Sequence, residues 1–281
     1  MRFGDQVRDG LVDEHCGGLR LGIDLGTANI VASVVDGSDH PVTGAWVHST
    51  VVRDGVVVDW LGATSAVRDL VTEVQTRLDH EFSAASISIP PGISPGDIQV
   101  FANVITAAGL DVDEVVDEPV AAARAMGITD GCVIDIGAGT TGVSVLQHGR
   151  VVLSHDEATG GHHMTLVLAG ANGVTYDAAE AMKKDPSQRM TVQGAIHPTL
   201  NKMATIAQHV LGDRQVPVVY LVGGSSCFDN AVSTFEARLG RSVVRPADPL
   251  FVTPLGIGMR APARSVGSMR APSSFGVVDG R

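Results

Sequence analysis

The stretch VIDIGAGTTG at residues 133–142 contains a G-x-G-x-x-G pattern directly after an apolar, β-branched run. Glycines in this position are typical of a dinucleotide-binding turn when a helix follows, because the helix N-terminus supplies the amides that hold a pyrophosphate. Here residues 143–152, VSVLQHGRVV, alternate and then turn at His148 and Gly149. This alternation predicts a second β-strand, so we interpret the region as a hairpin and reject a dinucleotide-binding turn.

A similar stretch occurs at residues 22–37, GIDLGTANIVASVVDG. Both copies contain isoleucine, aspartate, an apolar residue and glycine, then a small polar turn and another β-like run; the turn of the second copy is one residue longer. An internal repeat of this kind predicts two similar subdomains, each beginning with a hairpin whose first strand ends in an aspartate. An ordinary hairpin with a polar tip explains one copy as well, but it explains two matched copies poorly.

The residue types in these turns suit phosphate binding. Glycines and small hydroxyl residues let backbone N–H groups approach a phosphate closely. A carboxylate beside phosphates is repelled unless Mg²⁺ or its water shell lies between them. Two such turns facing each other across a cleft would hold a polyphosphate from both sides.

Composition restricts the class of protein. The chain has 281 residues, of which 44% are hydrophobic, and its formal net charge of −11 argues against nucleic-acid or membrane partners held by bulk electrostatics. The three cysteines, Cys16, Cys132 and Cys227, are far apart, which offers neither a disulfide framework nor a CxxC metal site. With no signal peptide and no run of about 20 apolar residues, we expect a soluble cytoplasmic protein.

A third glycine-rich element is VYLVGGSS at residues 219–226. It combines a buried-strand run with two glycines and two serines, and a helix-like segment with apolar residues at Val232, Phe235 and Leu239 follows. A strand that leads into a glycine-rich helix entry can accommodate an adenosine moiety against the backbone. Alone, this signal is weak.

Together, the three elements resemble the superfamily of actin, sugar kinases and heat-shock chaperone ATPases. GIDLGTAN is similar to its first phosphate motif, VIDIGAGTTG to the second and LVGGSS to the adenosine motif. DEPVAAARAMG (117–127) and TPLGIGM (253–259) resemble the two hinge helices, and AEAMK (179–183) resembles the AExxK of bacterial actins. The resemblance covers roughly residues 19–260, and the order and spacing of the elements agree.

Within that superfamily the chain resembles the ethanolamine-utilization protein EutJ family. The similar segments are VVRDGVVVDWLGA, SISIPPG, VVDEPVAAA, DEATGGHH and FVTPLGIGM. Genes of that family accompany those of bacterial microcompartments and cobalamin-dependent lyases. The resemblance therefore implies a chaperone-like or reactivating role and a cytoplasmic location that includes association with a microcompartment.

The implied fold is an α/β protein with two ribonuclease H-like, actin-like ATPase lobes and small inserted subdomains around a nucleotide cleft, without a peptide-binding domain. In the N-terminal extension, Phe3, Val7 and Leu11 form a thin apolar stripe that suits either local packing or docking to a partner. The expected boundaries are 1–18 for this extension, 19–129 for the first lobe with an insert at about 46–83, 130–260 for the second lobe with an insert at about 170–200, and 261–281 for a disordered tail.

The resemblance also implies ATP or ADP with Mg²⁺ as ligands. Asp24 and Asp135 would orient Mg²⁺ through water, and Glu118 would position the attacking water. The remaining expected contacts are the phosphate turns (Gly26, Thr27, Gly137, Gly139, Thr140), the sugar and base contacts (Gly161, Gly223, Gly224, Ser225) and the ribose cover (Glu180, Lys183).

The sequence departs from the chaperones in three places. Gly142 stands where they carry a second aspartate, Ala28 where they often carry a threonine, and the first insert has no lysine. Because phosphoryl transfer depends on positioning and charge neutralisation, these losses predict slow hydrolysis or binding without turnover. His155, His162 and His163 lack the spacing of a ligand helix, so we interpret them as turn residues near the nucleotide rather than metal ligands.

Three functions are compatible with these features. The leading hypothesis is an ATP-binding, chaperone-like switch that acts on a microcompartment lyase or shell protein, for example in reactivating a cobalamin-dependent ammonia-lyase. A polymerising or scaffold actin relative is the alternative, because bacterial actins share the AExxK and RDGVVVD features. A small-molecule kinase fits less well, because both inserts are short and 29.1 kDa is small for that group. The oligomeric state does not follow from the sequence.

Overall fold

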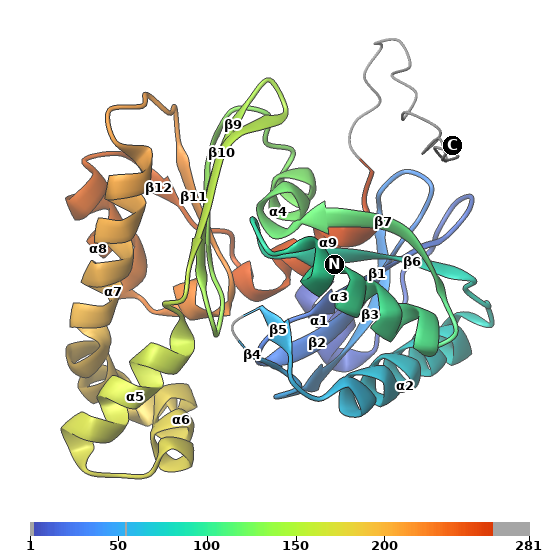
Figure 1. Ribbon diagram of the computed structural model, residues 1–281, viewed down its shortest axis with the longest axis horizontal. Helices are drawn as coiled ribbons and strands as arrows, with labels where there is room; N and C mark the ends of the chain where they lie inside the picture. Colours follow the sequence, from blue (N-terminus) through green and yellow to red (C-terminus); the bar gives the residue numbers. More distant parts are fainter. Residues whose placement is uncertain (1–2, 54, 261–281) are drawn as a thin grey trace, which may run out of the picture.

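The computed structural model describes residues 3–53 and 55–260, which form two lobes, each built on a five-stranded sheet (Figure 1). The sheets have the same topology, β3-β2-β1-β6-β7 in the first lobe and β10-β9-β8-β11-β12 in the second. In each, the first three strands of the lobe form an antiparallel meander and the last two are parallel to its first strand. The internal repeat is therefore a repeat of whole lobes, and the predicted fold class is confirmed.

The hairpins predicted from the repeated sequence are present in both lobes. The strands of the first sheet are β1 (Arg20–Leu25), β2 (Asn29–Val35), β3 (Pro41–His48), β6 (Ala84–Ile89) and β7 (Asp111–Asp117). Those of the second are β8 (Gly131–Ile136), β9 (Thr141–Gln147), β10 (Arg150–Glu157), β11 (Val219–Val222) and β12 (Val243–Val244). The turns between the paired strands cover residues 26–28 and 137–140, so the second is one residue longer, as the sequence predicts.

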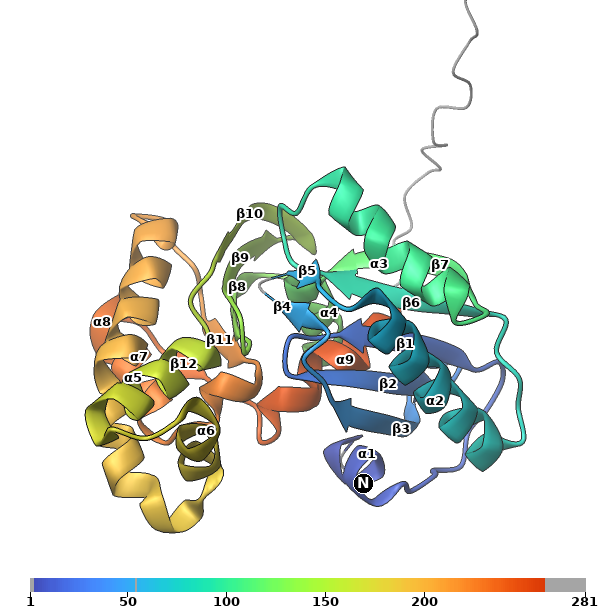
Figure 2. The ribbon, with the colours of Figure 1, turned by 60° about the horizontal axis from the view of Figure 1, so that its bottom comes forward.

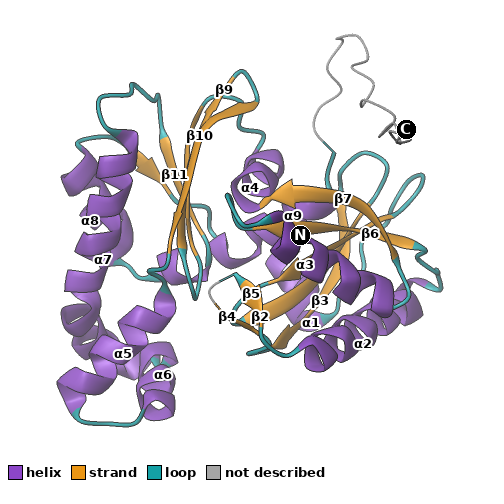
Figure 3. Cartoon of the chain, viewed as in Figure 1, coloured by secondary structure: helices purple, strands orange, loops and turns teal. Residues whose placement is uncertain are grey.

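Two helices cover the outer face of the first sheet, α2 (Trp60–Leu78) and α3 (Pro95–Ala107). The side chain of Asp59 accepts a hydrogen bond from a backbone N–H at the start of α2, and Ser94 does the same for α3. Figure 3 shows these helices on one side of the strands. The β-branched strands and the apolar helix faces together form the core of the lobe.

The insert predicted over residues 46–83 is much smaller in the structure. β3 extends to His48, and α2 is part of the core because its Val67 and Val74 are completely buried against the sheet. An amphipathic helix of this length must bury its apolar face, and the sheet offers the surface for it. Of the strands described in this lobe, those of the small hairpin, β4 (Val52–Arg53) and β5 (Val56–Val57), stand apart from its five-stranded sheet.

The helices of the second lobe include α5 (Gly161–Asn172), α6 (Tyr176–Lys184), α7 (Arg189–Leu211) and α8 (Asn230–Leu239). Helix α7 begins at Arg189 and passes through Pro198 without ending. Ile196 and Leu200 are fully buried in the core, which explains why this part of the predicted insert at 170–200 belongs to the helix. Short 3₁₀ turns occur at Pro186–Gln188, Gly224–Cys227 and Pro249–Phe251.

Helices α4 (Glu118–Met126) and α9 (Val252–Gly258) pack against each other between the two sheets, as the resemblance predicts for hinge helices (Figure 1). Their contact requires a glycine: a Cβ at Gly256 would lie 1.7 Å from the carbonyl oxygen of Ala121. The alanines of α4 and this glycine thus let the two backbones touch.

The N-terminal segment forms helix α1 (Phe3–Asp9), which lies against β3 (Figure 2). Phe3 and Val7 are buried, whereas Leu11 follows the helix and is 39% exposed. The predicted tail at 261–281 lies outside the described residues. Among the helices that the structure describes, none is long and apolar enough to cross a membrane.

Candidate functional site

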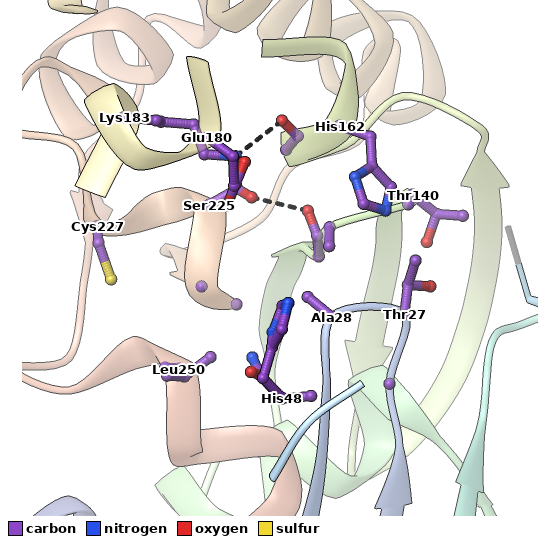
Figure 4. Close-up of a pocket in the computed structure, with 18 of the residues that line it drawn as sticks. Thr27, Ala28, His48, Thr140, His162, Glu180, Lys183, Ser225, Cys227 and Leu250 are labelled. Carbon is purple, nitrogen blue, oxygen red and sulfur yellow. Dashed lines mark hydrogen bonds and ion pairs between the residues drawn. The ribbon is translucent and has the colours of Figure 1, made fainter. Parts of the chain in front are cut away.

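A cavity of about 770 Å³ lies between the lobes and is lined by both repeated turns. Every residue that the sequence singles out for a nucleotide site contributes to its wall, from Asp24 on the first lobe to Ser225 on the second. Figure 4 shows Thr27 and Ala28 of the first turn together with Thr140 of the second in this pocket. Residues about 200 positions apart in the chain are therefore gathered in one place; their roles remain predictions.

The first wall centres on Asp24, which lies near the end of β1. Its carboxylate accepts a hydrogen bond of 3.2 Å from the hydroxyl of Ser88 on β6. Burial, and after it repulsion by Asp135, raises the pKa of Asp24 to about 7. A nearby cation would therefore stabilise the ionised carboxylate of Asp24.

The opposite wall centres on Asp135, near the end of β8. Its carboxylate accepts a hydrogen bond of 2.7 Å from Thr253 of α9, and burial raises its pKa. Gly223 must be a glycine here: its φ is +85°, and a Cβ would lie 2.2 Å from Oδ1 of Asp135 and 2.5 Å from the carbonyl oxygen of Ile136. The predicted adenosine motif therefore packs directly on the second phosphate strand.

Glu118 begins α4 and lines the same cavity as the two aspartates. Burial raises its pKa well above the ordinary value, and repulsion from Asp135 and then Asp24 adds to the effect. The three carboxyl groups are close enough to influence one another. Such perturbed acids in a cleft are typical of functional sites.

The donor set fits Mg²⁺ held through water and phosphate oxygens. Carboxylates are the ligands that Mg²⁺ prefers, and the ion usually keeps several of its waters. Among the described residues, no three acidic, histidine or cysteine side chains converge closely enough to hold a metal ion directly. The indirect contact of Asp24 and Asp135 with Mg²⁺ remains a prediction.

The far end of the cavity is closed by a network on the second lobe. Gly161 begins α5; its N–H donates to the carbonyl oxygen of Gly137 at 3.0 Å, and its own carbonyl accepts from Nζ of Lys183 at 3.1 Å. Ser225 donates to the same Gly137 carbonyl at 2.8 Å. Lys183 also forms an ion pair of 2.6 Å with Glu180, and Figure 4 shows both in the pocket wall. The predicted ribose and base contacts are thus linked to the second phosphate turn.

The three histidines do not form a cluster. His162 lines the cavity and hydrogen-bonds to the hydroxyl of Tyr176. His155 pairs with Glu157 at 3.4 Å, and His163 accepts a hydrogen bond from the N–H of Gly160 at 3.4 Å. The interpretation of all three as turn residues was wrong: His155 lies on β10, and His162 and His163 lie in the first turn of α5.

Three polar residues near the site did not emerge from the sequence as candidates. Ser88 and Thr253 donate to the two central aspartates, and they come from elements far away in the chain. Asp156 on β10 lies near Asp135, and burial raises its pKa to about 6. Asp156 lies in the segment DEATGGHH, at a distance from the glycine pattern that suits a ribose-binding carboxylate, but that interpretation was rejected together with the dinucleotide-binding turn. The pairing of β9 with β10 would have been needed to place it.

Comparison with known proteins agrees with this geometry. The family model for MreB/Mbl protein matches residues 45–169. The chain is 38% identical over 251 residues to the ethanolamine utilization protein EutJ of Salmonella typhimurium strain LT2, covering 89% of this chain and 88% of that protein. The crystal structure of EutJ from Carboxydothermus hydrogenoformans superposes with a TM-score of 0.85 at 41% identity, covering 91% and 94% of the two chains.

The fold is shared more widely. The structure of MreB5 of Spiroplasma citri bound to AMPPNP matches with a TM-score of 0.69 at 18% identity, over 85% of this chain and 94% of that one. At this identity the likeness concerns the fold alone. It shows that the two-lobed architecture occurs in a protein with a bound ATP analogue.

Proposed function

The chain belongs to the family of the ethanolamine utilization protein EutJ, and from this premise we propose that it binds ATP and ADP with Mg²⁺ in the cleft between its lobes. In this proposal it is a chaperone-like switch whose lobes open and close with the nucleotide. Its client is a lyase or shell protein of a bacterial microcompartment, and reactivation of a cobalamin-dependent ammonia-lyase is one form of that action. The site of action is then the cytoplasm, at or near the microcompartment.

One observation supports nucleotide binding above all: in each of the two repeated lobes, the next-to-last residue of the first strand is an aspartate, and both aspartates line one cavity. Asp24 and Asp135 line it from opposite walls. Burial raises the pKa of both carboxyl groups, and repulsion from Asp135 raises that of Asp24 further. Glycine-rich turns follow both strands and leave their backbone N–H groups near the same space. A magnesium-bound polyphosphate is the ligand that would use both features at once.

The proposed roles follow the geometry. Asp24 and Asp135 hold waters of the Mg²⁺ shell, and the turns at Gly26–Thr27 and 137–140 bind phosphate oxygens. Glu118 lines the same cavity and orients a water for slow hydrolysis. The sugar and base contact Gly161, Gly223, Gly224 and Ser225, with Glu180 and Lys183 above the ribose.

Isothermal titration calorimetry tests the binding step directly. We expect heat of binding for Mg·ATP and for Mg·ADP, and a loss of about 100-fold in affinity when Asp135 is replaced by asparagine, because an interaction with the metal's water shell is removed. Thermal unfolding of D135N serves as the control for folding. Absence of heat with both nucleotides in the intact protein would refute the proposal.

The switch is tested with the native host's extract. We expect the immobilised protein to retain a lyase or shell protein in only one of two conditions, saturating Mg·ATP or saturating Mg·ADP. Bound proteins are identified by mass spectrometry. The D135N variant is the control at a nucleotide concentration that saturates the unaltered protein but leaves the weaker-binding variant mostly empty. Identical partners in both conditions would leave nucleotide binding intact but remove the switch.

A scaffold or polymer is the second candidate, favoured by exposed apolar residues at the starts of two helices. Leu61 at the start of α2 is 74% exposed, and Met190 at the start of α7 is 87% exposed. Exposed apolar side chains of this size are suited to contacts between protein molecules. Light scattering with and without Mg·ATP distinguishes the two: a nucleotide-dependent rise indicates a polymer, and a constant signal supports the switch.

A further inference from the structure

Gly142, Asp135 and Asp156 form one row across the second sheet. Asp135 on β8 pairs with Gly142 on β9, and Gly142 pairs with Asp156 on β10. Directly opposite residues of antiparallel strands point to the same face, so the two acids flank a position without a side chain. Neighbouring strands lie about 4.8 Å apart. The side chains of Asp135 and Asp156 can therefore approach each other only because Gly142, on the strand between them, has no side chain.

Asp156 occupies the space above Gly142. A Cβ built on Gly142 would lie 3.4 Å from Oδ1 of Asp156, which is its nearest neighbour outside the adjoining residues. The carboxylate therefore leans from β10 over β9, toward Asp135. A side chain longer than alanine at position 142 would have to displace it.

The carboxylate of Asp156 is only partly satisfied. Burial raises the pKa of Asp156 and hydrogen bonding with Thr140 of the phosphate turn lowers it, while Oδ1 is buried and has no hydrogen-bond partner among the described residues. A buried carboxylate oxygen without a donor is costly. Repulsion between Asp156 and both Asp135 and Glu118 shows that it belongs electrostatically to the same cluster.

We propose that Asp156 supplies from β10 the carboxylate that Gly142 cannot supply from β9, and that its unpartnered oxygen accepts a hydrogen bond from a water of nucleotide-bound Mg²⁺. The inference rests on the proposed nucleotide site and adds a positioning residue to it. It also accounts for the departure noted in the sequence, where the chaperones carry an aspartate at position 142. The acid is kept in the site but is delivered by the next strand.

A swap of the two positions tests this assignment. D156N keeps the shape of the side chain and removes its charge, G142D crowds and repels Asp156, and the double variant G142D/D156A moves the carboxylate from β10 to β9. E157Q is the matched control, because Glu157 is exposed and alternation along β10 points it to the other face. Circular dichroism and thermal unfolding establish that each variant is folded.

The readout is the affinity for ADP measured by calorimetry with Mg²⁺ and with EDTA. We expect D156N to reduce the Mg²⁺-dependent gain in affinity by about 10- to 100-fold, as loss of a partner behind a metal ligand does, while the affinity in EDTA changes little. G142D should behave similarly, G142D/D156A should recover most of the gain, and E157Q should match the unaltered protein.

The outcomes separate the two proposals. If the unaltered protein binds ADP with a Mg²⁺-dependent gain and D156N retains that gain, Asp156 has no such role and the proposed function stands. If the unaltered protein binds ADP without any gain from Mg²⁺, the assignment also fails. If it binds no nucleotide, the proposed function fails and the assignment with it.

Discussion

The two lobes share one topology but differ at the row of residues beside the central aspartate. In the second lobe the row is Asp135, Gly142 and Asp156; in the first lobe the corresponding pairs place Val31 beside Asp24, and Trp46 beside Val31. Val31 is buried with Phe3, Val7 and Phe251, and the ring of Trp46 meets Phe251 edge-on at 6.3 Å between centroids.

The repeat therefore preserves the frame and one aspartate per lobe, while the neighbouring strands differ. In the first lobe, Val31 and Trp46 of this row pack against helix α1 and the segment before α9. In the second lobe, the row contains two carboxyl groups instead. Fold symmetry thus predicts where the two walls of the site lie but not that they are chemically unequal. The following substitutions test this inequality, beginning with the largest expected effect.

An acid introduced into the first row should be far more damaging than a change at the equivalent place in the second. V31D would bury a carboxylate among Phe3, Val7 and Phe251, so we expect a loss of about 3 kcal/mol or more in the free energy of unfolding. G142A adds a Cβ at ordinary contact distance from Asp156 and should cost about 1 kcal/mol or less. Urea unfolding measures both.

V31A is the control for that comparison, because it removes the packing of Val31 without adding charge. A smaller loss in V31A than in V31D shows that the charge is responsible. Equal losses in V31D and G142A would contradict the proposed difference between the rows.

The pH dependence of stability should distinguish the acids of the two walls. Because the folded-state pKa of Asp24 is raised to about 7, its contribution to stability is present below its ordinary pKa of 3.8 and is lost as pH rises toward 7. D24N removes this loss, so at pH 8 in the absence of ligand the variant should be more stable by about 1–3 kcal/mol. For Asp156 the same loss is complete near pH 6.

Urea unfolding between pH 4 and pH 8 measures these windows. The advantage of D24N should grow up to about pH 7, and that of D156N should level off about one unit lower. D36N is the control of opposite sign: backbone N–H groups of Cys16, His40 and Ser38 lower the pKa of Asp36, so its contribution is present at neutral pH and is lost as pH falls. A flat difference between D24N and the unaltered protein would contradict the buried, repelled state of Asp24.

Much of the frame and of the candidate site could be predicted from the sequence, because repeated glycines, strand-terminal acids and hinge motifs are local signals. The hairpins at Asp24 and Asp135 and the start of α4 at Glu118 are of this kind. Asp156 was not predicted as part of the site, because its role depends on the strand register that pairs it with Gly142. The insert boundaries failed for a related reason: whether α2 stands apart or covers the sheet is decided by packing and not by its own periodicity.

The smallest effect on stability is expected from helix α1, which packs on the first lobe and contacts the second through Arg8. Arg8 donates two hydrogen bonds, of 2.8 and 2.9 Å, to Asp248 and lies over the ring of Phe251 at 4.9 Å. The side chain of Arg8 is 44% exposed, so solvent screens the pair, and we expect R8A to reduce the free energy of unfolding by only about 0.5–1 kcal/mol. The double-mutant cycle with D248A isolates the interaction from the packing.

Salt sharpens the same measurement. The coupling energy between Arg8 and Asp248 should shrink as ionic strength rises to about 1 M, where the Debye length is about 3 Å. R68A is the control, because Arg68 makes an exposed hydrogen bond of 2.9 Å to the carbonyl oxygen of Ala107 within the first lobe. A coupling that persists unchanged at high salt would contradict a solvent-screened ion pair between Arg8 and Asp248. The stacking of Arg8 on Phe251 is measured separately, as the loss that R8A still causes in the D248A background.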